Sequence, residues 1–437
     1  MRLRRAVAAG RCDAKRAAMG LSSAATGGSL TAPPGSCDEI ISFTHPRRST
    51  DTPVNGPWTI DWRVHARCAK GEDRVLVLPS GRRAAKSGVG GTYLEWRSTL
   101  SDEELEASAL KGARLFCVFD GHGGAEGAEM ARQRLPVALL DALAPIVGAS
   151  PTTDGALVAA LPAALTSAME RLDAEIKAAC VKAGATATVV VIVGDVVTVA
   201  NAGDSRCVLI TPEVHEGAGP GSGGKCGSAV SGLFKGIVPA HVRLSEDHRP
   251  EDSQSEVRRV RAAGAVVGRI QERSTGMLVG PLRVYPGGLA VSRSLGDARA
   301  HACVMGTPHV CQVDLGRLPP AVGWAQLVVA SDGLWDVAKD SEVAAAVRRV
   351  KAKGAAAHLA YLASVRRANR GCPDDITIAS IYWSRETPAG CDYRTAADAG
   401  GTAMLETLVR VLSDAPEAAM GDEGDKERGA VDAPGVE

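Results

Sequence analysis

The stretch that decides the fold is Leu115–Gly124, LFCVFDGHGG. Its first five residues form a short apolar run with the length and residue types of a buried β-strand. Asp120 ends the run, and a carboxylate at the end of a buried strand, next to a glycine that blocks no ligand, suits a hard cation. His122 adds a group that can carry a proton near neutral pH. Taken alone, the motif is equally compatible with an ordinary turn, because Asp-Gly is common turn chemistry.

The composition of the chain excludes several classes of protein. The 437 residues suffice for one large domain or two ordinary ones, with 50 basic and 50 acidic residues and 3% aromatics. This balance favours neither nucleic acid nor an acidic membrane, and few aromatics are left for base stacking, so we expect no nucleic-acid partner. The longest apolar run, 187–200, is interrupted by Gly194 and Asp195 and is too short to span a bilayer.

The cysteines and the two ends of the chain bear on its location and its domains. Eleven scattered cysteines without a CxxC pair fit a reducing compartment, so we expect an intracellular protein of the cytoplasm or nucleus. Residues 1–55 resemble either an organelle transit peptide, which would direct the protein to a plastid or mitochondrion, or an Ala-rich disordered extension. We expect one domain over 56–384, with insertions near 82–112 and 216–232, and a largely disordered acidic tail over 385–437.

Acidic residues recur where the expected strands begin or end. They are Glu72 and Asp73 before the strand 74–78, Asp120, Asp204 after the strand 196–201, Asp332 after the strand 326–330, and Asp374 before the strand 376–383. Any one of them could be a turn or cap residue. Five strand ends that behave alike indicate a common rim, because strand ends of a packed sheet can lie along one edge.

Such a rim has a definite chemistry. Several carboxylates that face one another cannot all stay ionised without cations between them. Oxygen ligands without a partnering Cys or His favour Mg²⁺ or Mn²⁺ over zinc. Two such ions about 3.5–4 Å apart would activate a water and stabilise an in-line displacement at phosphorus. The residues alone therefore predict a binuclear phosphohydrolase.

Local patterns predict several further elements. The β-branched runs 187–193 and 196–201 flank a Gly194-Asp195 turn, which is typical of a hairpin. Ser101 opens a short helix, and Ser253 with Glu256 forms a capping box before a helix that stops at Gly264. The Ala/Leu-rich segments 125–144 and 155–183 are helical in period, with interruptions at Pro136 and Pro162.

Five motifs together resemble the ordered signature of the type 2C protein phosphatases, which are metal-dependent serine/threonine phosphatases. They are FDGHGG (119–124), AGDSR (202–206), LAVSRSLGD (289–297), SDGLWDV (331–337) and DDIT (374–377). The resemblance covers about Trp58 to Trp383 and implies an α+β fold, a β-sandwich of two antiparallel sheets flanked by α-helices. It also implies phosphoprotein substrates, and we expect a monomer.

The resemblance also assigns roles by position. Asp120 would bridge two metal ions, Gly121 would offer its backbone carbonyl to one of them, and Asp332 and Asp374 would complete the first site. Asp204 matches a position associated with a weaker third ion, and His122 matches the proposed general acid.

The N-terminal motif departs from the family pattern of an Arg a few residues before a Glu-Asp pair. Arg82-Arg83 is followed by no carboxylate, so we assign the second metal to Glu72 and Asp73. Arg67 is then our choice for the cation that binds phosphate, because Arg suits bidentate phosphate binding better than Lys. Arg63 and Lys70 are alternatives nearby.

A competing hypothesis is a catalytically dead phosphatase-like scaffold that binds phosphoproteins or a partner, which the unclear N-terminal motif motivates. Retention of Asp120, Asp332 and Asp374 argues against it, because a scaffold has no need to keep repelling carboxylates together. Asp336 and Asp375 are adjacent to expected ligands in sequence and are candidates for supporting them.

Overall fold

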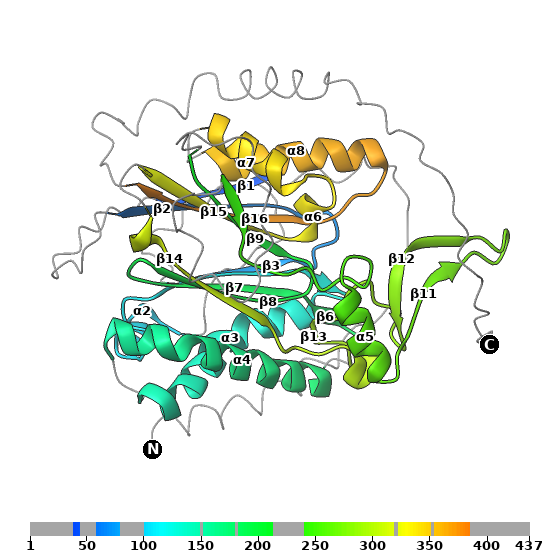
Figure 1. Ribbon diagram of the computed structural model, residues 1–437, viewed down its shortest axis with the longest axis horizontal. Helices are drawn as coiled ribbons and strands as arrows, with labels where there is room; N and C mark the ends of the chain where they lie inside the picture. Colours follow the sequence, from blue (N-terminus) through cyan, green and yellow to red (C-terminus); the bar gives the residue numbers. More distant parts are fainter. Residues whose placement is uncertain are drawn as a thin grey trace, which may run out of the picture. The chain divides into compact units, whose positions relative to one another are not determined.

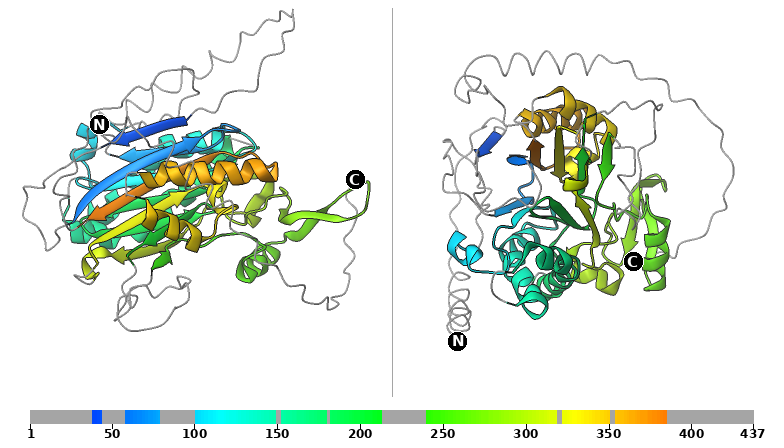
Figure 2. Two further views of the ribbon diagram at one scale, coloured as in Figure 1. Left: turned by 90° about the horizontal axis from the view of Figure 1, so that it is seen from above. Right: turned by 60° about the vertical axis from the view of Figure 1, so that its left-hand side comes forward.

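Two antiparallel β-sheets face each other and share an apolar core between them (Figure 1). The structure is a computed structural model that describes residues 38–43, 58–78, 100–148, 152–179, 182–212, 240–318, 322–350 and 354–384. Helices cover the outer face of each sheet (Figure 2), so the predicted α+β sandwich is confirmed.

The first sheet has six strands in the order β1-β2-β16-β15-β9-β10. Their bounds are Asp38–Phe43 (β1), Thr59–Arg67 (β2), Ile376–Ser384 (β16), Trp324–Ala330 (β15), Arg206–Ile210 (β9) and His241–Arg243 (β10). The second sheet has five strands in the order β14-β8-β7-β4-β3. Their bounds are His309–Asp314 (β14), Val196–Ala202 (β8), Ala187–Val193 (β7), Arg114–Phe119 (β4) and Arg74–Leu78 (β3).

Strand β4 explains why the opening motif is apolar throughout. Phe116 and Val118 face the core between the sheets, whereas Leu115, Cys117 and Phe119 pack under the helices on the other face. Because both faces of the strand are buried, its sequence is a continuous apolar run instead of an alternating one.

The helices form the two outer layers. The five-stranded sheet is covered by α2 (Asp102–Glu106), α3 (Glu126–Val147) and α4 (Asp154–Ala179), and the six-stranded sheet by α6 (Asp332–Trp335), α7 (Asp340–Arg349) and α8 (Ala355–Arg370). The expected interruptions at Pro136 and Pro162 are wrong, since α3 and α4 run through them. Leu135 and Leu161 beside these prolines are fully buried, so packing on the sheet outweighs the lost backbone bonds.

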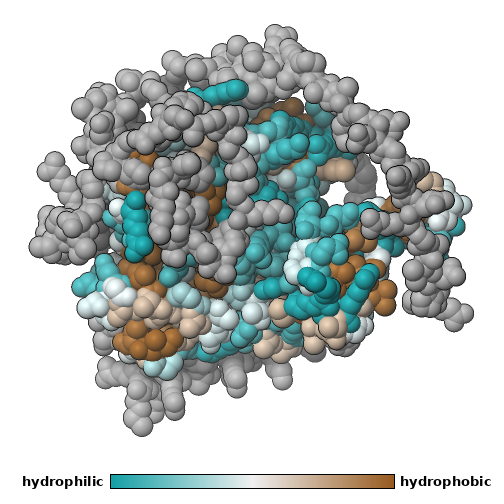
Figure 3. Space-filling view, viewed as in Figure 1, coloured by the Kyte–Doolittle hydropathy of each residue, from teal (hydrophilic) through white to brown (hydrophobic). Residues whose placement is uncertain are grey.

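Smaller elements lie at one end of the sandwich. A three-stranded sheet joins β5 (Gly121–His122), β6 (Gly184–Ala185) and β13 (Leu295–Gly296). Nearby are α5 (Gln254–Ala262), the hairpin strands β11 (Val266–Gln271) and β12 (Leu278–Tyr285), and the 3₁₀ helix η2 (Ala298–Cys303); η3 (Leu315–Arg317) follows β14. Brown, hydrophobic residues are visible on this side in Figure 3, and the hairpin exposes Met277 and Leu278 among others.

Several local predictions are confirmed. The hairpin of β7 and β8 forms in the expected register, with Val193 opposite Val196. Ser101 caps α2 in a capping box. Ser253 caps α5, but the side chain of Glu256 turns inward to two arginines instead of back to the cap. The predictions for 1–55, 82–112, 216–232 and 385–437 fall mostly outside the described residues. The exceptions are 38–43, which form β1 and pair with β2 where a transit peptide or disordered extension was expected, and 100–112, which contain α2.

Candidate active site

Three of the predicted acidic residues meet at one rim of the sandwich. Asp120 follows β4, Asp204 lies just after β8, and Asp332 follows β15 as the first residue of α6. One carboxylate oxygen from each lies within 4.8 Å of the others. Strands from both sheets therefore bring together side chains that are far apart in the sequence.

The electrostatics of this cluster are unfavourable for anions. Burial, with the charges of Asp73, Asp204 and Asp374, raises the pKa of Asp120 well above its usual value. Burial and the charges of its acidic neighbours, Asp120 first, raise the pKa of Asp332 in the same way. Carboxylates that are held together against such repulsion are a ready site for a cation, which would restore their ionised forms.

Asp374 joins the rim at the start of β16. Helix α6 can lie against the start of β16 because residue 333 is glycine: a Cβ atom there would lie 1.9 Å from the carbonyl oxygen of Asp375. Arg367 links the two sides: its Nη1 lies 3.2 Å from Asp374 Oδ2, and its Nη2 lies 3.6 Å from Asp332 Oδ1. The rim therefore includes the fourth predicted acid, although not within the tight group of three.

The loop that carries Glu72 and Asp73 wraps around one carboxylate. Asp375 accepts hydrogen bonds from the backbone N–H groups of residues 69–73, five donors at 2.5–3.1 Å. Burial opposes the charge, but these donors outweigh it and lower the pKa of Asp375. Asp375, which the sequence marked as a candidate support, fixes the loop because its side-chain carboxylate accepts these main-chain N–H groups.

The same loop meets the opening motif. Glu72 Oε1 accepts from the N–H of Gly124 at 2.9 Å, and a Cβ atom on Gly121 would lie 2.5 Å from the carbonyl oxygen of Glu72. Burial and the charge of Asp375 raise the pKa of Asp73 to about 7. Asp73 Oδ2 is buried and has no hydrogen-bond partner among the described residues, which leaves a ligand oxygen for a cation.

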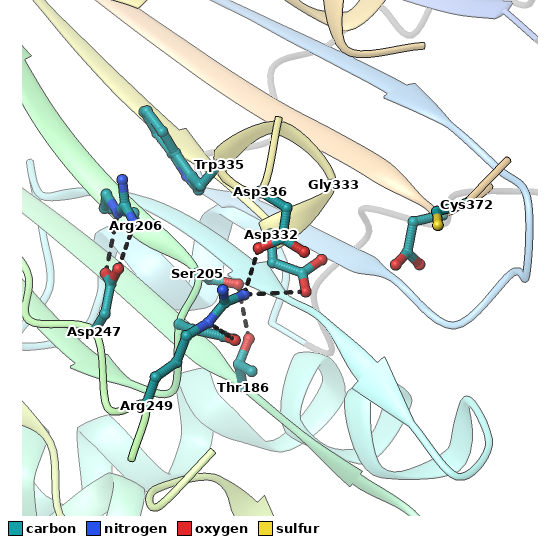
Figure 4. A network of polar contacts seen from close by, with 12 residues as sticks. Thr186, Ser205, Arg206, Asp247, Arg249, Asp332, Gly333, Trp335, Asp336 and Cys372 are labelled. Carbon is teal, nitrogen blue, oxygen red and sulfur yellow. Dashed lines mark hydrogen bonds and ion pairs between the residues drawn. The ribbon is translucent and has the colours of Figure 1, made fainter. Parts of the chain in front are cut away.

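Arginine enters the acidic rim from the segment before α5. Arg249 Nε lies 2.6 Å from Asp204 Oδ2, and its Nη2 lies 2.7 Å from Asp336 Oδ1 and 3.5 Å from Asp332 Oδ2. Figure 4 shows its guanidinium pointing at the carboxylates of Asp332 and Asp336. The motif EDHRP contains this residue, but no local pattern showed that it reaches the acids.

His122 lies beside the rim, in β5. Its Nε2 is 2.7 Å from Asp297 Oδ2, and its side chain is 28% exposed, so the ring remains accessible. Burial lowers the pKa of His122, but the hydrogen bond and the charge of Asp297 outweigh burial and the net pKa is raised. Asp297 belongs to the motif LAVSRSLGD but was not among the site residues predicted from the sequence.

The three candidate phosphate-binding cations occupy different places. Arg67 is the last residue of β2, opposite Ile376 at the rim end of β16. Arg63 pairs with Asp61 at 2.7 Å further along β2. Lys70 lies at the acids, with its Nζ 2.6 Å from Asp374 Oδ1. Partial burial lowers the pKa of Lys70, but Asp374 and its acidic neighbours outweigh burial and raise it.

The fold and the rim together define an α+β sandwich with an acidic group of oxygens that could hold a metal ion. A family profile described as protein phosphatase 2C matches residues 88–374, more than half of the chain. The chain belongs to the protein phosphatase 2C family.

Curated relatives and a solved structure agree with this placement. "Probable protein phosphatase 2C 15" of Arabidopsis thaliana is 37% identical over 71% of this chain and 57% of its own length. "Probable protein phosphatase 2C 69" of Oryza sativa subsp. japonica is 35% identical over 62% of this chain and 51% of its own length, so the chain spans about half the length of these relatives.

The crystal structure of a serine-threonine phosphatase 2C from Toxoplasma gondii shares the fold. It superposes with a TM-score of 0.54 at 18% identity and covers 80% of this chain and 100% of that chain. Among the described residues, no helix is long and apolar enough to cross a membrane.

Proposed function

We propose that this chain is a metal-dependent protein phosphatase that hydrolyses phosphoserine and phosphothreonine with a metal-activated water. The observation that carries the proposal is the meeting of Asp120, Asp204 and Asp332, whose oxygens lie within 4.8 Å of one another. Membership of the protein phosphatase 2C family supports the same activity.

The donor set suits Mg²⁺ or Mn²⁺, because it consists of oxygens and includes the unpartnered Oδ2 of Asp73. When bound, the ions would supply an activated water and neutralise charge on the phosphoryl group. One ion would be held by Asp120, the carbonyl of Gly121, Asp332 and Asp374. A second would be held by Glu72 and Asp73 with Asp120, and a weaker third by Asp204.

His122 would act as the general acid. As the water oxygen bonds to phosphorus, the bond to the Ser or Thr oxygen breaks and its electron pair stays on that oxygen. The imidazolium of His122 would protonate this oxygen, so an alcohol and inorganic phosphate leave without a covalent phosphoenzyme. The accessible ring beside the acidic rim supports this role.

Arg67 remains our prediction for the cation that binds the phosphate, and the contact of Lys70 with Asp374 makes Lys70 the stronger alternative to it. Arg67→Ala and Lys70→Ala should therefore be compared for KM on a phosphopeptide. The variant that raises KM while kcat falls less identifies the cation, because it loses binding in the ground state as well as in the transition state.

The proposal is tested by hydrolysis of a phosphothreonine peptide with Mn²⁺ and with excess chelator. We expect turnover that requires the metal and that Asp120→Asn abolishes. Asp314→Asn is a matched control, because Asp314 is exposed and pairs with Arg317 on η3. Activity that the chelator leaves unchanged would contradict the proposal.

The second candidate is the phosphoprotein-binding scaffold without activity. Arg249 and Lys70 favour it, because their cations already contact three of the rim carboxylates and could hold them together without metal. A scaffold would bind the phosphopeptide but release no phosphate at any Mn²⁺ concentration, which the same assay detects.

A further inference from the structure

The proposed general acid, His122, has a buried partner, Asp297, which has no role in the proposed function. Asp297 Oδ2 lies 2.7 Å from His122 Nε2, although the two residues are 175 positions apart. Asp297 is 5% exposed, and Ser294 Oγ also donates to the same oxygen. A carboxylate accepts hydrogen bonds only, so Nε2 of the imidazole is the donor and is fully used.

A small sheet brings the two side chains together. His122 in β5 lies opposite Gly184 in β6, and Gly184 lies opposite Gly296 in β13. Outer strands of such a sheet are about 10 Å apart, so their neighbouring side chains meet only if the middle residue leaves room. A Cβ atom on Gly184 would lie 2.3 Å from Asp297 Oδ2, so the glycine makes this contact possible.

The backbone at Asp297 is held in an unusual conformation. Asp297 has φ 56° and ψ 49°, the left-handed region, and is the one described non-glycine residue with positive φ. A residue other than glycine persists in this region only where its surroundings impose it. Asp173 in α4 holds the adjoining backbone, because its carboxylate accepts the N–H of Gly296 at 2.8 Å and of Gly306 at 3.0 Å.

We propose that Asp297 is a positioning residue that fixes the ring of His122 so that Nδ1 presents the proton to the departing oxygen. The inference rests on the proposed function. In the step, water forms a bond to phosphorus and releases one proton to solvent. The bond to the Ser or Thr oxygen breaks with its electron pair on that oxygen, which takes the proton from Nδ1, and His122 is reprotonated from solvent.

The test compares two substrates that differ in their need for an acid. A Ser or Thr oxygen is a poor leaving group and requires a proton, whereas the nitrophenolate of p-nitrophenyl phosphate leaves as an anion. We expect Asp297→Asn, which keeps the size and tolerates a left-handed backbone, to lower kcat on the phosphopeptide by about 10–100-fold, within the range of general acid catalysis. On p-nitrophenyl phosphate the loss should be a few-fold at most.

Matched variants separate positioning from damage to the fold. Asp173→Asn loosens the same loop but keeps the carboxylate of Asp297 beside His122, so it should slow the phosphopeptide less than Asp297→Asn does. The double variant His122→Gln/Asp297→Asn should be no slower on the phosphopeptide than His122→Gln alone, because the two residues act as a unit. Ser294→Ala, which leaves the carboxylate in place, should give a smaller loss of the same selectivity if Asp297→Asn does not fold.

The outcomes distinguish the two levels of the account. If Asp297→Asn slows both substrates equally, or adds to the effect of His122→Gln, the positioning role is wrong. If His122→Gln itself shows no preference between the substrates, the acid role in the proposed function fails. If the native chain hydrolyses neither substrate with Mn²⁺, the proposed function fails as a whole.

Discussion

Two buried acidic regions of this molecule differ in how their charge is balanced. At the rim, burial and mutual repulsion raise the pKa values of Asp120 and Asp332 well above the usual value. In α5, the buried Glu256 accepts hydrogen bonds from Arg293 and Arg259, which outweigh burial and lower its pKa to about 2. Two arginines suffice to keep the single carboxylate of Glu256 ionised. At the rim, Arg249, Arg367 and Lys70 contact the acids but leave the pKa values of Asp120 and Asp332 raised, which indicates a site for a further, external cation.

The largest effect should come from Asp332→Asn. We expect a loss of phosphopeptide turnover of about 10³-fold, the scale of removing an electrostatic group that acts in the transition state. The same change should raise the melting temperature of the metal-free protein, because it removes a buried charge that its neighbours repel. Turnover and thermal melts check both signs. Near-native activity would contradict the assignment of Asp332 to the metal site.

Glu256→Gln should have the opposite effect on stability and make the fold less stable. The folded pKa of about 2 lies below the unfolded value of 4.5, so Glu256 stabilises the fold above pH 4.5, and this contribution is lost as the pH falls through about 2. The shift corresponds to about 3 kcal/mol at neutral pH. Unfolding in urea between pH 7 and pH 3 should show the wild type losing more stability than the variant. Parallel pH profiles would contradict the balanced-charge account.

Asp375→Asn tests whether the main-chain N–H groups that the Asp375 carboxylate accepts hold the metal-binding loop in place. The amide cannot accept from all five N–H groups of residues 69–73, so the loop with Glu72 and Asp73 should loosen. We expect Mn²⁺ affinity to fall by about 10–100-fold, as when a residue that orients metal ligands is lost. Calorimetry measures it, with Asp314→Asn as the exposed control. Unchanged affinity would mean that this loop does not contribute ligands.

The smallest effect should come from Ser101→Ala, outside both regions. Ser101 caps α2 by accepting the N–H of Glu104 at 3.1 Å, and such a cap contributes about 1 kcal/mol. We expect slightly lower stability in urea with kcat and Mn²⁺ affinity unaltered. A change in Mn²⁺ affinity would show that stability and metal binding are not separable in this fold.

Local patterns predicted much of the fold and the acidic positions. The β-branched runs and turn of the β7–β8 hairpin, the cap at Ser101 and the acids at strand ends all depend on a few neighbouring residues. The sandwich itself was implied by the five family motifs taken together.

Contacts across the chain could not be predicted in the same way. Asp297 reaches His122 only because Gly184 lies between them in a sheet of two-residue strands, and Arg249 reaches Asp336 across 87 positions of sequence. Glu256 turned from its expected cap to Arg293, which lies on a distant segment. Such pairings are decided by topology and packing, for which the local sequence carries no signal.

The central claim, that the repelling carboxylates at the rim form a divalent-cation site, is tested most directly by calorimetric titration of Mn²⁺ into the full chain at pH 7. We predict saturable binding by the wild type and by Glu256→Gln, and a loss of at least about 10-fold in affinity for Asp120→Asn, which corresponds to about 1.4 kcal/mol. No saturable binding by the wild type, or equal binding by Asp120→Asn, would contradict it.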